Sequence, residues 1–217
     1  MIHIVLGTKA QLVKMAPIMV GLQKIPIGYN LIFTGQHRAT ISEMLNDFGL
    51  KSPDIELYTG RDIVSLPQMF AWAVRILMSC LTSRSRIFKN DHNGIVLVHG
   101  DTFSTVLGAL MGKIAGFKVG HVESGLRSFN IFHPFPEELT SLVTFKLSDI
   151  LFCPGEWSLK NMRKYQDRKK IINTGIQLKS GRTSAIPRAK NVSIQKNEKR
   201  VAARNAPIKI SAIGEPK

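Results

Sequence analysis

Residues 95–122 read IVLVHGDTFSTVLGALMGKIAGFKVGHV and place a strand, a helix and a second strand in close succession. Ile95–His99 and Lys118–Val122 are short runs built around branched apolar residues, which are typical of strands buried in a parallel sheet. Residues 103–115 between them are rich in Gly, Ala and Leu and predict a helix. This stretch therefore indicates a helix that connects two parallel strands.

The same alternation of strand and helix extends in both directions along the chain. Further strands are predicted at residues 2–6, 31–34, 149–153 and 171–174, and further helices at 10–24, 39–48, 62–82, 137–147 and 156–165. Pro17 predicts either a kink or a late start of the first helix. The alternation predicts an α/β fold with an open, doubly wound parallel sheet of Rossmann type.

Charge and composition divide the 217 residues into two parts. The chain has 30 Lys and Arg against 15 Asp and Glu, a net charge of +15. Residues 178–217 hold ten of the basic and two of the acidic side chains, no aromatic residue and only isolated apolar ones. We therefore predict one folded domain over residues 1–177 and a disordered basic tail over 178–217.

The composition favours anionic partners and disfavours disulfide-rich, membrane-spanning and metal-binding proteins. The basic balance favours nucleic acid, anionic membrane or phosphorylated small molecules as partners, without choosing among them. Cys80 and Cys153 form no paired motif, so we expect no disulfide framework and a cytoplasmic location. There is no uncharged apolar run of about 18 residues, so no membrane span is expected. The six histidines show no tight ligand spacing, so no metal site is predicted.

The turn after the first strand carries positive charge. Gly7-Thr8-Lys9 follows the strand directly, and Lys14 comes within the next helix. Ligands of open α/β sheets bind beyond the carboxyl ends of the strands, and a helix N-terminus there favours phosphate. Lys9 and Lys14 would neutralise a diphosphate, although both could equally be solvated surface charge. The glycine patterns of dinucleotide-binding and ATP-binding loops are missing, which argues against those ligands.

Three acidic residues follow strands or open a helix. Asp101 and Glu123 each come just after a strand, and Glu137 opens a helix behind two prolines. Each has a structural alternative: a helix cap for Asp101, an ion pair with Arg127 for Glu123, and a favourable helix dipole for Glu137. If they converge at one sheet edge, their pKa values separate, so that one group holds a proton while another accepts one. The pattern then predicts a general acid and a general base.

Five motifs, in order and spacing, resemble those of UDP-N-acetylglucosamine 2-epimerases. They are GTKAQLVKMAP (7–17), TGQHR (34–38), VHGDT (98–102), GHVESGLR (120–127) and PFPEE (134–138). The resemblance covers residues 1 to about 177 and ends in NTG (173–175), which leads into the second domain of the family. It implies the N-terminal half of a glycosyltransferase-B-type fold. Residues 178–217 do not resemble the second domain, so the resemblance implies that this domain is missing.

The resemblance implies an isomerase of polysaccharide biosynthesis. Such an enzyme interconverts UDP-N-acetylglucosamine (UDP-GlcNAc) and UDP-N-acetylmannosamine (UDP-ManNAc) by anti elimination and re-addition of UDP, without a cofactor. Some members hydrolyse the intermediate instead and release N-acetylmannosamine and UDP. A chain without the second domain could also be inactive alone, or a non-catalytic remnant.

The resemblance also implies roles for individual residues and partners. Asp101, Glu123 and Glu137 match the catalytic acids of the family by position. Four further positions match substrate-binding residues: Lys9, Lys14, Gln36 and His37. The implied partners are a UDP-sugar and, in the intact family, further copies of the chain, with neither specific nucleic acid nor membrane.

The chain departs from the family pattern at two places. Lys9 stands where many members have an arginine, so the charge is kept but the bidentate fork is lost. Leu139-Thr140-Ser141 stands where the family often has a variable residue followed by Asn-Arg. A basic residue that could hold Glu137 or a phosphate is therefore missing.

Overall fold

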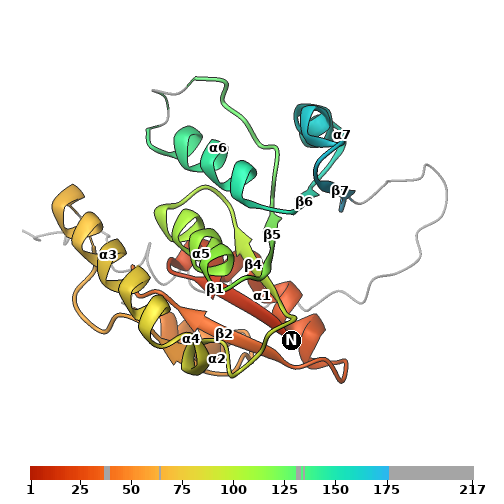
Figure 1. Cartoon of the computed structure of the whole chain (residues 1–217). Coiled ribbons are helices and arrows are strands. Elements are labelled where there is room, and N and C mark those ends of the chain that lie inside the picture. The colour runs from red at the N-terminus through yellow and green to blue at the C-terminus, as the bar shows by residue number, and fades with distance from the viewer. Residues whose placement is uncertain (37–39, 64, 131–132, 134, 176–217) are drawn as a thin grey trace, which may run out of the picture. The chain divides into compact units, whose positions relative to one another are not determined.

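The computed structural model describes residues 1–36, 40–63, 65–130, 133 and 135–175. Within them, seven strands form one sheet in the order β3-β2-β1-β4-β5-β6-β7 (Figure 1). Every neighbouring pair is parallel, which confirms the predicted doubly wound α/β fold. The strands are β1 (Ile2–Leu6), β2 (Tyr29–Phe33), β3 (Ile55–Glu56), β4 (Ile95–His99), β5 (Lys118–Val122), β6 (Ile150–Cys153) and β7 (Lys170–Asn173).

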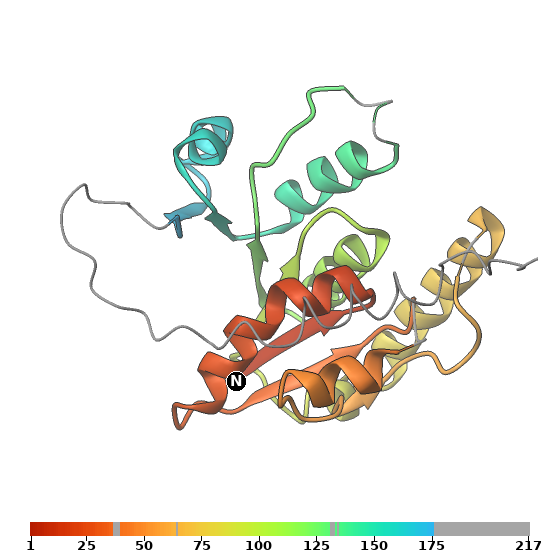
Figure 2. The same ribbon diagram turned by 180° about the vertical axis from the view of Figure 1, so that it is seen from behind.

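Helices cover both faces of this sheet. They are α1 (Lys9–Gln23), α2 (Ile41–Asp47), α3 (Leu66–Thr82), α4 (Arg84–Ile87), α5 (Phe103–Ile114), α6 (Glu137–Leu147) and α7 (Glu156–Met162), followed by a 3₁₀ turn at Arg163–Tyr165. Figure 2 shows α1 and α2 on one face, and Figure 1 shows α3 and α5 on the other. Because successive strand residues point to opposite faces, Ile4 packs in the core under α1, while its neighbour Val5 packs in the core under α3 and α5.

Most predicted elements are confirmed within one or two residues. Two differences have a physical cause in helix capping. The Thr8 side chain accepts a hydrogen bond from the Gln11 backbone and caps α1, so the helix starts before Pro17 and the predicted late start is wrong. Ser65 caps α3 in the same way, so that helix begins four residues later than predicted. Strand β3 was not predicted, because two residues show no alternation.

The strand order creates a topological switch point at the centre of the sheet. β1 and β4 are neighbours, but α1 and α5 leave them toward opposite faces, which makes their carboxyl ends the switch point where such folds bind ligands. Helix α6 packs against α5 and brings its own N-terminus to this region.

The predicted tail at 178–217 and the boundary at residue 177 lie outside the described residues and stay predictions. In the described part, none of the helices combines the length and the hydropathy that crossing a membrane requires.

Candidate active site

Gln11 ties together the two loops at the switch point. Its Oε1 accepts hydrogen bonds from the backbone N–H groups of Gly7 (2.8 Å) and Thr8 (3.1 Å). Its Nε2 donates to the His99 carbonyl and to the Thr105 hydroxyl, both at 2.9 Å. These bonds are buried, so Gln11 fixes the end of β1 against the end of β4. Gln11 is not among the predicted site residues, although the Thr-x-x-Gln spacing of a capping box is a signal for it.

Gly7 lies where three elements meet. A Cβ atom at this position would come within 2.2 Å of the Thr34 hydroxyl and 2.3 Å of the Ser104 hydroxyl. Only glycine therefore lets β1, the end of β2 and the start of α5 approach this closely.

The Glu123 carboxylate contacts one side chain from α1 and one from β4. Lys14 of α1 donates from Nζ to Glu123 Oε1 at 2.8 Å, and Nε2 of His99 lies 3.1 Å from Oε2. The hydrogen bond to Glu123 raises the pKa of Lys14, so that side chain is not simple solvated charge. The alternative ion pair between Glu123 and Arg127 is wrong.

The backbone at Glu123 is strained. Its φ of 65° lies in the left-handed region, which costs a residue with a side chain about 1–3 kcal/mol. Such strain persists only where the surrounding structure enforces it. With this backbone conformation, the Glu123 side chain contacts both Lys14 and His99.

Two buried histidines, His99 and His121, lie near the acidic residues. Burial lowers the pKa of His99 against the opposing effect of Glu123, so the neutral ring donates its Nε2–H to that carboxylate. Burial also lowers the pKa of His121, to about 4. His121 lies 2.7 Å from the Gly100 carbonyl through Nε2, which must carry the proton because a carbonyl only accepts.

Hydrogen bonds to two successive backbone carbonyls fix the loop that carries Asp101. His121 donates to the carbonyl of Gly100, and the Thr140 hydroxyl of α6 donates to the carbonyl of Asp101 itself. Thr102 caps α5, since its hydroxyl accepts a hydrogen bond from the Thr105 N–H. The alternative that Asp101 caps this helix is therefore wrong.

The carboxylates are close enough to influence one another. Loss of hydration is the largest cause that raises the pKa of Asp101, and Glu137, Glu123 and Glu138 raise it further by repulsion. The three acids predicted from the sequence therefore come together at one edge of the sheet. Among the described residues, no three His, Cys, Asp or Glu side chains are placed to hold a metal ion.

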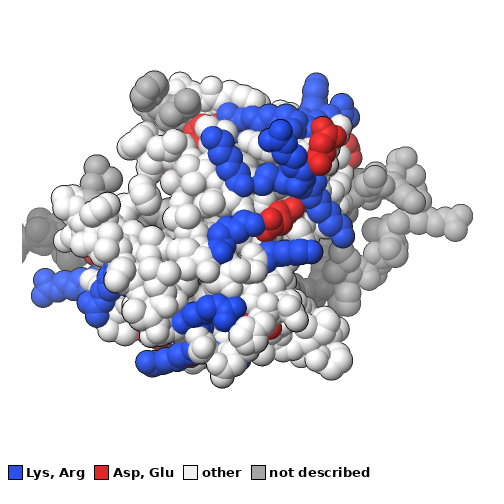
Figure 3. Space-filling model, in the orientation of Figure 1, with Lys and Arg blue, Asp and Glu red and all other residues white. Residues whose placement is uncertain are grey.

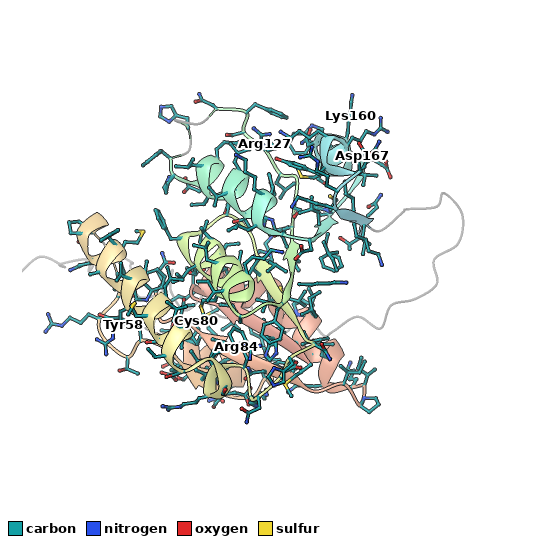
Figure 4. The ribbon with its side chains drawn as sticks, in the orientation of Figure 1. Tyr58, Cys80, Arg84, Arg127, Lys160 and Asp167 are labelled. Carbon is teal, nitrogen blue, oxygen red and sulfur yellow. The ribbon has the colours of Figure 1, made fainter. Side chains whose placement is uncertain are left out.

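Glu137 and Glu138 are adjacent in sequence but differ in their surroundings. Glu138 is only 3% exposed and binds the guanidinium of Arg127, which Figure 4 labels, and the amide and hydroxyl of Ser128. Burial alone would raise the pKa of Glu138, but the hydrogen bonds from Ser128 and the charge of Arg127 lower it. By contrast, Oε2 of Glu137 is buried and finds no hydrogen-bond partner in the described part of the chain. Glu138 therefore holds the loop, and Glu137 has an oxygen left for a ligand.

The four predicted binding residues are placed differently. Lys9 is the first residue of α1, half-buried, and forms no ion pair with any described residue. Gln36 is buried, and its Oε1 accepts a hydrogen bond from the Ser104 hydroxyl at 2.5 Å, so this oxygen joins the end of β2 to α5. Lys14 is paired with Glu123, as described above. His37 lies outside the described residues.

Within the departing segment 139–141, Thr140 and Ser141 are both buried. Thr140 bonds the carbonyl of Asp101 and, at 2.9 Å, that of Glu137. Ser141 is buried, with 5% of its surface exposed. Neither residue carries a positive charge.

Together these features define a doubly wound α/β domain with a group of acidic residues at its switch point. Loss of hydration raises the pKa of Asp101, and Glu123 accepts a hydrogen bond from Lys14. The family model of UDP-N-acetylglucosamine 2-epimerase matches residues 22–205, which is more than half of the chain. The chain belongs to this family.

Individual relatives agree with the family model. The chain is 36% identical over 161 residues to the UDP-N-acetylglucosamine 2-epimerase of Bacillus subtilis, covering 74% of this chain and 40% of the relative. It is 33% identical over 172 residues to the enzyme of the same name from Campylobacter jejuni, covering 79% and 43%. The chain thus spans about two fifths of the length of these curated relatives.

Solved structures show the same fold. The UDP-GlcNAc 2-epimerase of Neisseria meningitidis bound to UDP-GlcNAc matches with a TM-score of 0.65 at 30% identity, over 80% of this chain and 45% of that one. The Methanocaldococcus jannaschii enzyme in complex with UDP-GlcNAc and UDP matches with a TM-score of 0.65 at 26% identity, over 78% and 45%. These neighbours support the glycosyltransferase-B-type, Rossmann-like fold expected from the sequence.

Proposed function

We propose that this chain carries the proton-transfer site for the 2-epimerisation of UDP-GlcNAc to UDP-ManNAc. The observation that carries the proposal is the convergence of Asp101, Glu123 and Glu137 at the switch point, where their repulsion and loss of hydration raise the pKa of Asp101. Family membership supports the substrate, since the related structures contain UDP-GlcNAc and UDP.

The chemistry needs two groups on opposite faces of the sugar. One carboxylate removes the proton from carbon 2, and the electron pair expels UDP from carbon 1. UDP then adds back to carbon 1, while a proton returns to carbon 2 from the other face. We assign proton removal to Glu123, because Lys14 and His99 orient its carboxyl group, and proton return to Asp101, because its raised pKa makes it the better proton donor. The cycle is redox-neutral, so the proposal includes no cofactor.

Glu137 completes this set of acids. Removal of UDP leaves positive charge developing at carbon 1, which a nearby carboxylate oxygen stabilises. Oε2 of Glu137 is buried and has no partner among the described residues. We therefore assign charge stabilisation at carbon 1 to Glu137.

Substrate binding is assigned to the start of α1 and the end of β2. Lys9, Lys14 and the α1 N-terminus would neutralise the diphosphate, and Gln36 and His37 would line the sugar side. Because Lys14 already contacts Glu123, a diphosphate that draws Lys14 away would free the base. We further propose a cytoplasmic protein that works as a homo-oligomer.

Product analysis tests this function. The chain is incubated with UDP-GlcNAc, and the products are identified by proton NMR. We expect UDP-ManNAc, with a rate at least about 100-fold lower for Asp101→Asn and Glu123→Gln, the loss typical of a missing acid or base. Glu43→Gln, an exposed change on α2, serves as the control and should leave the rate unchanged. Free N-acetylmannosamine as the product would overturn the non-hydrolysing reaction, and equal rates for all variants would overturn the assigned acids.

A further inference from the structure

The segment that follows β6 is densely positive. Residues 156–170 hold six basic side chains against two acidic ones. Figure 3 shows lysines and arginines gathered around α7, and Figure 4 labels Lys160 on this helix. Lys169 is half-buried, and its Nζ donates to the backbone carbonyls of Lys146 (2.8 Å) and Ser148 (2.5 Å). The other five basic side chains are exposed: Lys160, Arg163, Lys164, Arg168 and Lys170.

These five charges are not neutralised within the described part of the chain. None of them forms an ion pair with a described residue, whereas four lysines elsewhere each bind a carboxylate, namely Lys14, Lys51, Lys89 and Lys113. Like charges gathered on one surface repel each other and attract anions. We call the five residues, together with Trp157, the α7 basic surface. Its charge is complementary to an extended anionic partner.

The helix places an aromatic side chain in line with this charge. Ser158 and Met162 are buried on the inner side of α7. Trp157, Lys160 and Lys164 recur every three or four positions, so they lie in one row on the outer side. The Trp157 side chain is 54% exposed. The outer side of α7 therefore presents an indole ring beside two ammonium groups.

We propose that the α7 basic surface docks on a membrane that contains anionic lipids. Anionic headgroups attract Lys and Arg, and tryptophan side chains are enriched at the level of the headgroups because one end of the indole is apolar and the other polar. A row that combines both kinds of side chain fits the surface of such a bilayer without crossing it. The family pattern implies no membrane partner, so this contact is a property of the surface of this chain.

The aromatic neighbours of the surface argue against nucleic acid as its partner. Phe129, which is 63% exposed, meets Trp157 edge to face with the ring centroids 6.4 Å apart. The guanidinium of Arg127 lies over the Phe129 ring, 4.8 Å from its centroid. Single-stranded nucleic acids bind by stacking their bases on free ring faces. Here the rings already contact each other and Arg127, whereas insertion among headgroups needs only an exposed apolar edge.

Vesicle binding by the full chain tests the proposal. The chain is mixed with vesicles of phosphatidylcholine, with or without one third phosphatidylglycerol, and the bound fraction is measured by sedimentation. We expect binding to the anionic vesicles alone, weakened by added salt. Lys160→Glu combined with Lys164→Glu should weaken this binding at least about 25-fold, because each basic residue near an anionic surface strengthens it about fivefold.

Lys24→Glu combined with Arg86→Glu is the matched control. It changes the net charge by the same amount at two exposed basic positions. Both positions lie beside β2, far along the sheet from β7: Lys24 follows α1, and α4 holds Arg86. Charges more than about 8 Å from the membrane are largely screened, so this variant should bind within about twofold of the unaltered chain. Residues 178–217 are the same in both variants, so any attraction that they add cancels in the comparison.

Tryptophan fluorescence locates the contact in the unaltered chain. Trp72 and Trp157 are the two tryptophans, and Trp72 is buried, with 2% of its surface exposed. Anionic vesicles should therefore shift the emission of Trp157 to shorter wavelength, and brominated lipids should quench it.

Three results would each overturn the proposal: no binding to anionic vesicles, equal binding by the two glutamate variants, or Trp157 emission that bound vesicles leave unchanged. Tighter binding of single-stranded DNA that quenches Trp157 would assign the surface to nucleic acid and overturn it as well. The α7 basic surface shares no residue with the group of acids at the switch point, so these outcomes are independent of the proposed function.

Discussion

Asp101 and Glu123 are both strand-end carboxylates, but their neighbours differ. Glu123 accepts a hydrogen bond from the ammonium group of Lys14. Asp101 has acidic neighbours, and loss of hydration together with their repulsion raises its pKa. A difference of this kind lets two chemically similar groups serve as base and acid at the same pH.

The partner of Glu123 could not be predicted from the sequence. Arg127 stands four residues after it, a spacing that pairs charges on a helix. Residues 123–125 form a turn instead, and Arg127 binds Glu138 of α6. The true partners of Glu123, Lys14 and His99, come from other elements, so no local spacing revealed them.

Replacing His121 should change how stability depends on pH. The folded pKa of His121 is about 4, below the usual 6.5, so between these values the unfolded chain binds a proton that the folded chain does not. Stability therefore falls as pH drops from 6.5 to 4, by up to about 3 kcal/mol for this group. His121→Gln should reduce that fall, as measured by urea unfolding at pH 4 to 7. His92→Gln, at an exposed position, should leave it unchanged; an unaltered fall in His121→Gln would contradict the assignment.

Thr140 should act by positioning Asp101. Thr140→Val removes the hydroxyl that donates to the Asp101 and Glu137 carbonyls while keeping the shape of the side chain. We expect the epimerisation rate to fall about tenfold, which corresponds to a single misplaced hydrogen bond of about 1.4 kcal/mol, while UDP affinity measured by calorimetry stays the same. Thr82→Val, at the exposed end of α3, is the control. Weaker UDP binding with an unchanged rate would show that Thr140 does not position Asp101.

At the scale of elements, the strand-end turns and helix starts build the site. The apolar runs predicted the central strands well, because a buried parallel strand has to be apolar on both faces. The two-residue β3 carries too little pattern to be predicted. The positions of Asp101, Glu123 and Glu137 at one sheet edge followed from the alternation of strands and helices, whereas the clamps between elements depend on packing that no local pattern encodes.

Gln11 is the clamp with the largest expected effect on stability. Gln11→Met keeps the length of the side chain but leaves the Gly7 and Thr8 N–H groups and the His99 carbonyl without their buried partner. We expect the free energy of unfolding to fall by about 2–4 kcal/mol, because each unsatisfied buried group costs about 1–3 kcal/mol. Chemical denaturation measures this loss. Gln23→Met, at the exposed end of α1, should change stability little, and an equal effect of both substitutions would argue against the clamp.

At the scale of the whole molecule, the three acids lie at the carboxyl edge of the sheet. Asp101 and Glu123 follow β4 and β5, and Glu137 begins α6. The chain spans about two fifths of the length of its curated relatives. We propose that this α/β domain contributes proton transfer at carbon 2.

Solvent exchange at carbon 2 tests this claim most directly. The full chain is incubated with UDP-GlcNAc in D₂O, and the carbon-2 proton is followed by NMR. The account predicts that deuterium replaces this proton as UDP-ManNAc forms, and that Glu123→Gln slows the replacement at least about 100-fold. A folded chain that binds UDP-GlcNAc and leaves the carbon-2 proton in place would contradict it.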